Sequence, residues 1–262
     1  MLARSVKSIV KKIPALYSLL QTAARPFRQS GDLKRVRKYC SQLPERVQQP
    51  TFVMVGASDG ITEDPVSDIF LSDARWKGVL IEPVPYCFQR LAGTFQDVSR
   101  FALEQVAIGN TSTEASFYYV APNATDEDGN RPYWFDQVGS FDREHVLKLL
   151  GDRFERFIVE CSVEVHPLSK ILRRHKIDHL DFLQIDTEGY DYEILKTLDL
   201  AQHAPSAILV EHSHLPCAER EEMLKLLRLN GYGVDSCDPD NYFAIHQGAP
   251  LRRIVRDQAG AS

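Results

Sequence analysis

Residues 51–88 contain two apolar runs separated by a glycine-containing turn and a helical stretch. The first run, residues 52–55, leads into the turn 56–60, and the second, residues 78–81, ends in Glu82. Short apolar runs that alternate with helical segments are typical of parallel strands joined by crossover helices. We therefore expect an open α/β sheet, whose ligand crevice lies at the carboxyl ends of its strands.

The turn differs from the dinucleotide-binding fingerprint. It reads Gly-Ala-Ser-Asp-Gly, whereas the fingerprint needs G-x-G-x-x-G to make room for a pyrophosphate. Asp59 would repel a pyrophosphate and suits a cationic ligand, while Glu82 follows Gly60 at the spacing expected of an acid that binds ribose. S-adenosylmethionine carries a sulfonium, an ammonium group and a ribose, so it fits both acids. The alternative is an ordinary crossover with a solvated Asp59.

Length and charge restrict the function classes. A chain of 262 residues with 44% hydrophobic and 26% charged residues forms one large α/β domain or two small ones. The net charge of −5 argues against nucleic acid as a partner. Residues 1–40 hold ten basic residues and one acid, which gives +9 and leaves −14 for residues 41–262.

The basic N-terminal segment has apolar residues at helical spacing over residues 2–20. This pattern is too short and interrupted for a membrane span or a good secretory signal, but a basic amphipathic helix binds anionic membrane surfaces. The alternatives are a helix packed on the domain and a loose arm. We predict a basic helical extension at 1–45, an α/β domain at 46–250 and a tail at 251–262.

Five cysteines are widely spaced and include no C-x-x-C pair, so neither a zinc site nor a disulfide framework is indicated. A reducing cytoplasm is the simpler location, with peripheral contact at the inner face of the membrane through residues 1–40 as a further expectation.

Three further segments complete the expected crevice. Residues 100–108 predict a third strand, whose polar end could reach an adenine edge. The long loop 122–139 carries aromatic residues at 133–135, which either stack on a sugar or pin the loop to the core. Residues 234–237 and 242–246 predict a terminal antiparallel hairpin.

Acidic residues follow two more apolar runs. Residues 182–185 lead into Asp186 and Glu188, a pair that can hold a hydroxyl substrate, act as a general base or bind a hard divalent cation such as Mg²⁺. The alternative is that these side chains cap the following helix. Residues 207–210 lead into Glu211-His212-Ser213-His214, in which at least one of Glu211, His212 and His214 is expected in the site. The candidate metal ligands are Asp186, Glu211 and His212.

The motifs VGASDG, GVLIEPVP, EQVAIGN, GSF, FLQIDTEGYDYEIL and LVEH occur in the order and spacing of FkbM-family methyltransferases, which the chain resembles over residues 52–246. The resemblance implies a Rossmann-like class I fold with a seven-stranded, mostly parallel sheet, a C-terminal antiparallel hairpin and helices on both faces. It also implies S-adenosylmethionine as the cofactor and a hydroxyl oxygen of a sugar, glycan or related natural product as the acceptor.

Carried over by motif, the resemblance places Gly56 and Asp59 near the methionine end of the cofactor, Glu82 on the ribose, and Asp186 and Glu188 beside the transferring methyl group and the acceptor. For the general base the candidates are Asp186, Glu188 and His212, with a bound Mg²⁺ that acidifies the hydroxyl as the alternative. The implied cofactor-binding residues are Gly56, Ala57, Ser58, Asp59, Gly60, Glu82, Pro83, Gln105, Val106, Ala107 and Asp186. Ser58 replaces the asparagine that is commoner in the family. Two rival functions are a cofactor-fold binding protein without activity and an NAD-dependent nucleotide-sugar enzyme.

Overall fold

A computed structural model of the chain describes residues 33–126, 129–201 and 203–249. The helix expected at 2–20 and the tail expected at 251–262 lie outside the described residues.

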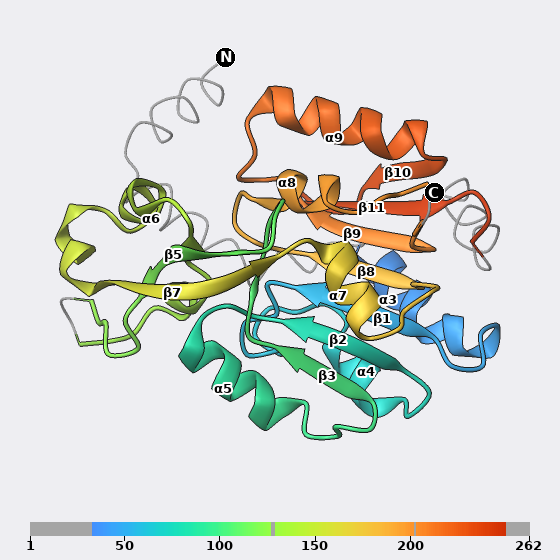
Figure 1. The fold of residues 1–262 in the computed structure, drawn as a ribbon, viewed down its shortest axis with the longest axis horizontal. Helices are drawn as coiled ribbons and strands as arrows, with labels where there is room; N and C mark the ends of the chain where they lie inside the picture. The colour runs from blue at the N-terminus through green and yellow to red at the C-terminus, as the bar shows by residue number, and fades with distance from the viewer. Residues whose placement is uncertain (1–32, 127–128, 202, 250–262) are drawn as a thin grey trace, which may run out of the picture.

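The main sheet has seven strands in the order β10-β11-β9-β8-β1-β2-β3 (Figure 1). Neighbouring strands are parallel from β9 to β3, whereas β11 runs antiparallel to both β9 and β10. The strands are β1 (Thr51–Val55), β2 (Lys77–Ile81), β3 (Phe101–Glu104), β8 (Phe182–Ile185), β9 (Ala207–Glu211), β10 (Tyr232–Ser236) and β11 (Asn241–His246). The predicted Rossmann-like class I sheet, with its C-terminal hairpin, is confirmed.

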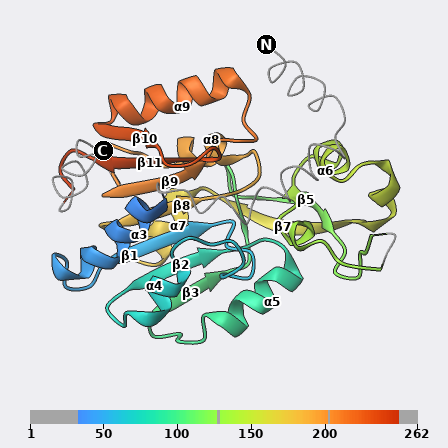
Figure 2. The same ribbon diagram turned by 180° about the vertical axis from the view of Figure 1, so that it is seen from behind.

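Helices cover both faces of this sheet because side chains alternate across each strand. In β1, Val53 and Val55 belong to one apolar core, whereas Phe52 and Met54 belong to the other. The first core includes residues of α7 (Leu168–Arg174), α8 (Asp191–Lys196) and α9 (Cys217–Leu229). The second includes residues of α3 (Leu33–Gln42), α4 (Ser67–Ser72) and α5 (Pro85–Thr94), and Figure 2 shows α3 and α4 in front of the sheet.

A second, four-stranded sheet in the order β4-β7-β5-β6 projects beyond the carboxyl ends of the parallel strands of the main sheet (Figures 1 and 2). Its strands are β4 (Ala107–Ile108), β5 (Thr113–Val120), β6 (Gly139–Ser140) and β7 (Ile158–His166). With α6 (Arg143–Leu150), η3 (Tyr133–Asp136) and η4 (Asp152–Phe157) it forms a separate small core. This projecting sheet supplies a second wall for the site described below.

The prediction of one strand at 100–108 is wrong, because that segment is divided between the two sheets. Its first part, β3, pairs with β2, and its last part, β4, pairs with β7. The division falls where Glu104 accepts hydrogen bonds from Arg174 and His175, at 2.6 Å each, and where Gln105 is exposed. The apolar residues on the two sides of this break consequently belong to different sheets.

The described part of the basic N-terminal segment is a helix packed on the sheet. Val36, Tyr39 and Cys40 of α3 are fully buried, and so is Leu43 of η2 (Leu43–Glu45). Among the described helices, none combines the length and the apolar character that a bilayer crossing requires. The five cysteines all lie in the described part of the chain, and none of them forms a disulfide there.

Candidate active site

A cavity of about 1010 Å³ lies at the carboxyl ends of β1, β2, β8 and β9. Residues at the end of each of these strands or directly after it line the cavity, and the opposite wall comes from the projecting sheet and from α6. Ligand pockets commonly measure roughly 300–1,000 Å³. This cavity is therefore large enough for a cofactor and a second molecule beside it.

The turn after β1 is held against the tips of both neighbouring strands. The backbone N–H groups of Gly56 and Ala57 donate to the carbonyl oxygen of Ile81, at 3.0 Å each. Gly56 has φ +78°, and a Cβ atom there would lie 1.8 Å from the carbonyl oxygen of Asp186. Only glycine fits this position, which brings the turn of β1 into backbone contact with the tip of β8.

Glu82 holds the first turn to the end of β2. Its Oε2 accepts from the N–H of Ser58 and its Oε1 from the N–H of Val84, at 2.8 Å each. The side chain is buried, and burial raises its pKa to about 7 although the two N–H donors favour the charged form. Glu82 lines the cavity, so its carboxylate is a hydrogen-bond acceptor held in a fixed position there. Because its pKa is about 7, its charge depends on the pH.

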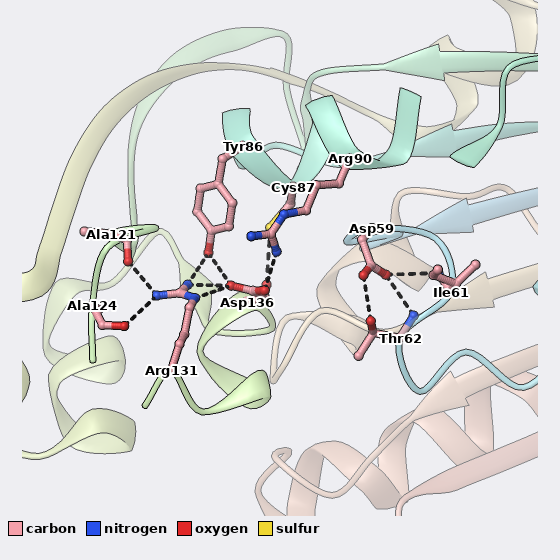
Figure 3. Close-up of polar contacts among 10 residues, drawn as sticks. All are labelled: Asp59, Ile61, Thr62, Tyr86, Cys87, Arg90, Ala121, Ala124, Arg131 and Asp136. Carbon is pink, nitrogen blue, oxygen red and sulfur yellow. Dashed lines mark hydrogen bonds and ion pairs between the residues drawn. The ribbon is translucent and has the colours of Figure 1, made fainter. Parts of the chain in front are cut away.

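Three of the predicted cofactor-binding residues lie outside the cavity lining: Asp59, Gly60 and Gln105. The Asp59 carboxylate accepts from the N–H groups of Ile61 and Thr62 and from the Thr62 hydroxyl, as Figure 3 shows. Burial alone would raise the pKa of Asp59, but these hydrogen bonds hold it below its usual value. Asp59 therefore stabilises its own loop through hydrogen bonds to Ile61 and Thr62. The remaining eight predicted residues line the cavity: Gly56, Ala57, Ser58, Glu82, Pro83, Val106, Ala107 and Asp186.

An acidic cluster occupies the ends of β8 and β9. Asp186 lines the cavity, and burial together with the charges of Glu188 and Asp191 raises its pKa well above the usual range. Asp191 accepts from the N–H groups of Thr187 and Gly189, at 3.0 Å each, so this residue closes the turn before α8. The capping alternative for Asp186 and Glu188 finds no support among the described residues, because the N-cap of α8 makes no side-chain hydrogen bond.

Glu188 connects the two walls of the site. Its φ of +56° is in the left-handed region, and its carbonyl oxygen lies 3.1 Å from His145 Nε2 of α6. Its carboxylate contacts His214 Nε2 at 2.8 Å. His145 was missed by sequence reasoning, because a single histidine in an amphipathic helix carries no local signal.

The two histidines after β9 lie in different surroundings. His214 Nε2 lies between the carboxylates of Glu188 and Glu211, at 2.8 and 3.5 Å. The ring of His212 stacks on Tyr242, with 3.8 Å between ring centroids, and is not part of the cavity lining. Of the predicted metal ligands, the structure therefore brings Asp186 and Glu211 to the cavity, but not His212.

Aromatic residues from the projecting sheet and from the turn before α8 form part of the cavity lining. Phe141 makes edge contacts with Phe117 and Tyr190, with centroid separations of 5.2 and 5.4 Å, and all three line the cavity. An apolar aromatic surface of this kind suits the face of a sugar or of another ring.

The loop aromatics at 133–135 serve mainly to fix the loop. Phe135 is fully buried in the small core, and Trp134 packs against it. Asp136 accepts from both Arg131 and Arg90, while Arg131 also donates to the carbonyl oxygens of Ala121 and Ala124 (Figure 3). Of the two alternatives for this loop, pinning to the core is confirmed for Phe135.

The sheet order and the position of the cavity define a Rossmann-like class I methyltransferase fold. The sequence profile described as "Methyltransferase FkbM domain" matches residues 55–234, which is more than half of the chain. The chain therefore belongs to the FkbM methyltransferase family, whose cofactor is S-adenosylmethionine.

No curated protein is significantly similar to the chain. Among solved structures, a methyltransferase FkbM from Methylobacillus flagellatus KT is similar at 16% identity and a TM-score of 0.46. That match covers 78% of this chain and 47% of the other, so the chain spans about half of that protein. A SAM-dependent methyltransferase from Aquifex aeolicus is similar at 11% identity and a TM-score of 0.34, with 88% of this chain and 96% of the other covered.

Proposed function

We propose that the chain transfers the methyl group of S-adenosylmethionine to a hydroxyl oxygen of a sugar, a glycan or a related natural product. The observation that carries the proposal is a cavity whose lining combines buried acids at the ends of the main-sheet strands with aromatic residues. The family supplies the reaction class, and the wall from the projecting sheet supplies the argument for a ring-bearing acceptor.

The cofactor would bind along the tips of β1 and β2. S-adenosylmethionine supplies a methyl carbon bonded to a positively charged sulfur. Glu82 is held by two backbone N–H groups and retains lone pairs that can accept from ribose hydroxyls. Val106 and Ala107 are buried cavity residues after β3 that suit the adenine ring.

The acceptor would bind between Asp186 and the aromatic wall. A hydroxyl oxygen that gains a methyl group must lose its proton, and a positioned carboxylate is a suitable acceptor for that proton. Asp186 lines the cavity next to the Gly56 turn, so we assign proton removal to Asp186 and orientation of the acceptor to Glu188. Alignment of oxygen and methyl carbon supplies much of the rate.

We further propose a glycolipid-type acceptor made at the inner face of the membrane. The support is the charge of +9 on residues 1–40 together with the position of α3, whose Leu33 and Lys34 line the cavity. The full chain should partition to anionic vesicles and be released by high salt. Equal partition to neutral vesicles would contradict this part of the proposal.

The rival functions differ in what they bind. A binding protein without catalytic activity does not require the acids of the site. Burial of a carboxylate such as Glu82 costs desolvation free energy, and an inactive site has no function that would retain it. The NAD-dependent enzyme requires pyrophosphate glycines that the turn lacks.

The direct test supplies the full chain with methyl-labelled S-adenosylmethionine and a panel of neutral sugars, glycolipids and polyketide-type alcohols. Labelled ether product and an equal amount of S-adenosylhomocysteine are expected with at least one ring-bearing alcohol. Labelling of amine or thiol acceptors alone would contradict transfer to oxygen.

A further inference from the structure

We propose that Glu188, Glu211 and His214 form a binding site for one divalent cation of the Mn²⁺ type. The cation-binding part of this inference stands on the geometry of these side chains. Its role, which is to hold the acceptor hydroxyl beside the methyl group, rests on the proposed function.

The three side chains converge at the strand tips. Glu188 follows β8, while Glu211 ends β9 and His214 follows it by three residues. One potential ligand atom from each lies within 4.8 Å of the other two. A shared cation about 2.1 Å from each ligand holds such atoms roughly 3–4.2 Å apart. A small rotation of one carboxylate therefore completes a common coordination sphere.

A second observation points to a ligand at this place. Glu211 is only 7% exposed, yet its Oε2 has no hydrogen-bond partner among the described residues. Its Oε1 accepts from the Ser213 hydroxyl at 2.7 Å. A buried carboxylate oxygen without a partner is costly, and a cation at the cluster removes that cost.

The charge of the cluster leads to the same conclusion. The carboxylates of Asp186, Glu188, Asp191 and Glu211 gather around one imidazole. Among the described residues that line the cavity, Lys34 and Arg37 are the only lysine or arginine, and Arg37 pairs with Asp68. Neither of these two basic side chains is seen to pair with the carboxylates of the cluster. A divalent cation bound there would offset the repulsion among the carboxylates.

The donor set selects the kind of cation. Carboxylate oxygens suit Mg²⁺, Ca²⁺ and Mn²⁺, whereas an imidazole nitrogen favours transition metals over Mg²⁺ and Ca²⁺. Two carboxylates with one imidazole therefore favour Mn²⁺ over Mg²⁺, and they leave coordination positions open toward the cavity for an acceptor oxygen.

The test is titration of the chelator-treated full chain with Mn²⁺, followed by the loss of the free-ion electron paramagnetic resonance signal. One ion per chain is expected. Glu188→Gln and His214→Gln should each weaken binding at least tenfold, whereas Glu222→Gln, an exposed change of the same chemistry on α9, should leave binding unchanged. The use of two cluster variants keeps the test valid if one of them fails to fold.

Absence of Mn²⁺ binding at millimolar concentration, or equal binding in the two cluster variants and wild type, would overturn the site. Titration of the same samples with S-adenosylmethionine separates the two proposals. Cofactor binding without Mn²⁺ binding would overturn the cation site alone. Mn²⁺ binding without cofactor binding would support the cation site and count against the proposed function.

Discussion

The α-carbon of Gly56 faces the carbonyl oxygen of Asp186 so closely that an added Cβ would lie 1.8 Å from it. This contact joins the tips of β1 and β8, the two strands from which the proposed cofactor and acceptor subsites begin. Backbone packing at this point fixes the distance between the two halves of the site.

Replacement of this glycine should be severe. In Gly56→Ala the added Cβ atom clashes with the backbone of Asp186, and the residue must also adopt a left-handed φ of +78°. We therefore expect a loss of at least about 3 kcal/mol of stability or failure to fold. Gly93→Ala in α5 is the matched control, because a Cβ there meets nothing within 4 Å. It should stabilise by up to about 1 kcal/mol. Urea unfolding of both variants tests this, and equal stabilities would contradict it.

The two arginines on Asp136 should differ in their contribution to stability. Arg131 is mostly buried and also bonds Ala121, Ala124 and the Tyr86 hydroxyl, whereas Arg90 is about half exposed. We expect Arg131→Gln to cost about 2–4 kcal/mol, because it leaves buried acceptors unpaired. Arg90→Gln should cost under about 1 kcal/mol. Comparable unfolding midpoints for the two variants would refute this assignment.

Glu82 should make stability depend on pH. The pKa of Glu82 is raised from 4.5 to about 7, so the folded state binds the proton more tightly than the unfolded chain. The contribution of Glu82 to the free energy of unfolding is thus greatest below pH 4.5, and it falls by up to about 3 kcal/mol as the pH rises through 7. In Glu82→Gln this fall should disappear. Unfolding of both proteins between pH 5 and 8, without cofactor, measures the difference, and parallel pH profiles would contradict it.

Asp186 should be needed for turnover more than for cofactor binding. Asp186→Asn keeps the size of the side chain and removes the proton acceptor, so methyl transfer should fall by about 10²–10⁴-fold. The affinity for S-adenosylmethionine should change only a few-fold. Asp178→Asn, an exposed change outside the cavity lining, is the control. Unimpaired transfer by the Asp186 variant would remove this residue from the mechanism.

Much of the main sheet could be predicted from the sequence, because each buried parallel strand is a short apolar run and its ligand-facing acids follow directly. Glu82, Asp186, Glu188 and Glu211 could be found in this way. The projecting sheet could not be predicted as a second sheet, because β5 and β7 pair across a long loop and no local pattern specifies their partner.

The histidines show a second limit. Residues beyond a strand end no longer alternate between two faces, so the direction of each side chain depends on the turn. Here the N–H of Leu215 donates to the carbonyl oxygen of His212, which closes a turn around Ser213. His212 then lies against Tyr242, and His214 lies between the carboxylates. Likewise, only the folded turn shows that Asp191 accepts from the N–H groups of Thr187 and Gly189 and so holds the turn before α8.

The measurement closest to the central claim is calorimetric titration of the full chain with S-adenosylmethionine, beside Glu82→Gln. Glutamine is preferred to alanine because it keeps the size of the side chain and an acceptor oxygen for one of the two N–H groups, whereas alanine would leave those of both Ser58 and Val84 without an acceptor. We predict micromolar binding to the wild type that strengthens from pH 6 to pH 8 and is at least tenfold weaker in the variant. No binding, or equal binding by the two proteins, would contradict the proposed cofactor site.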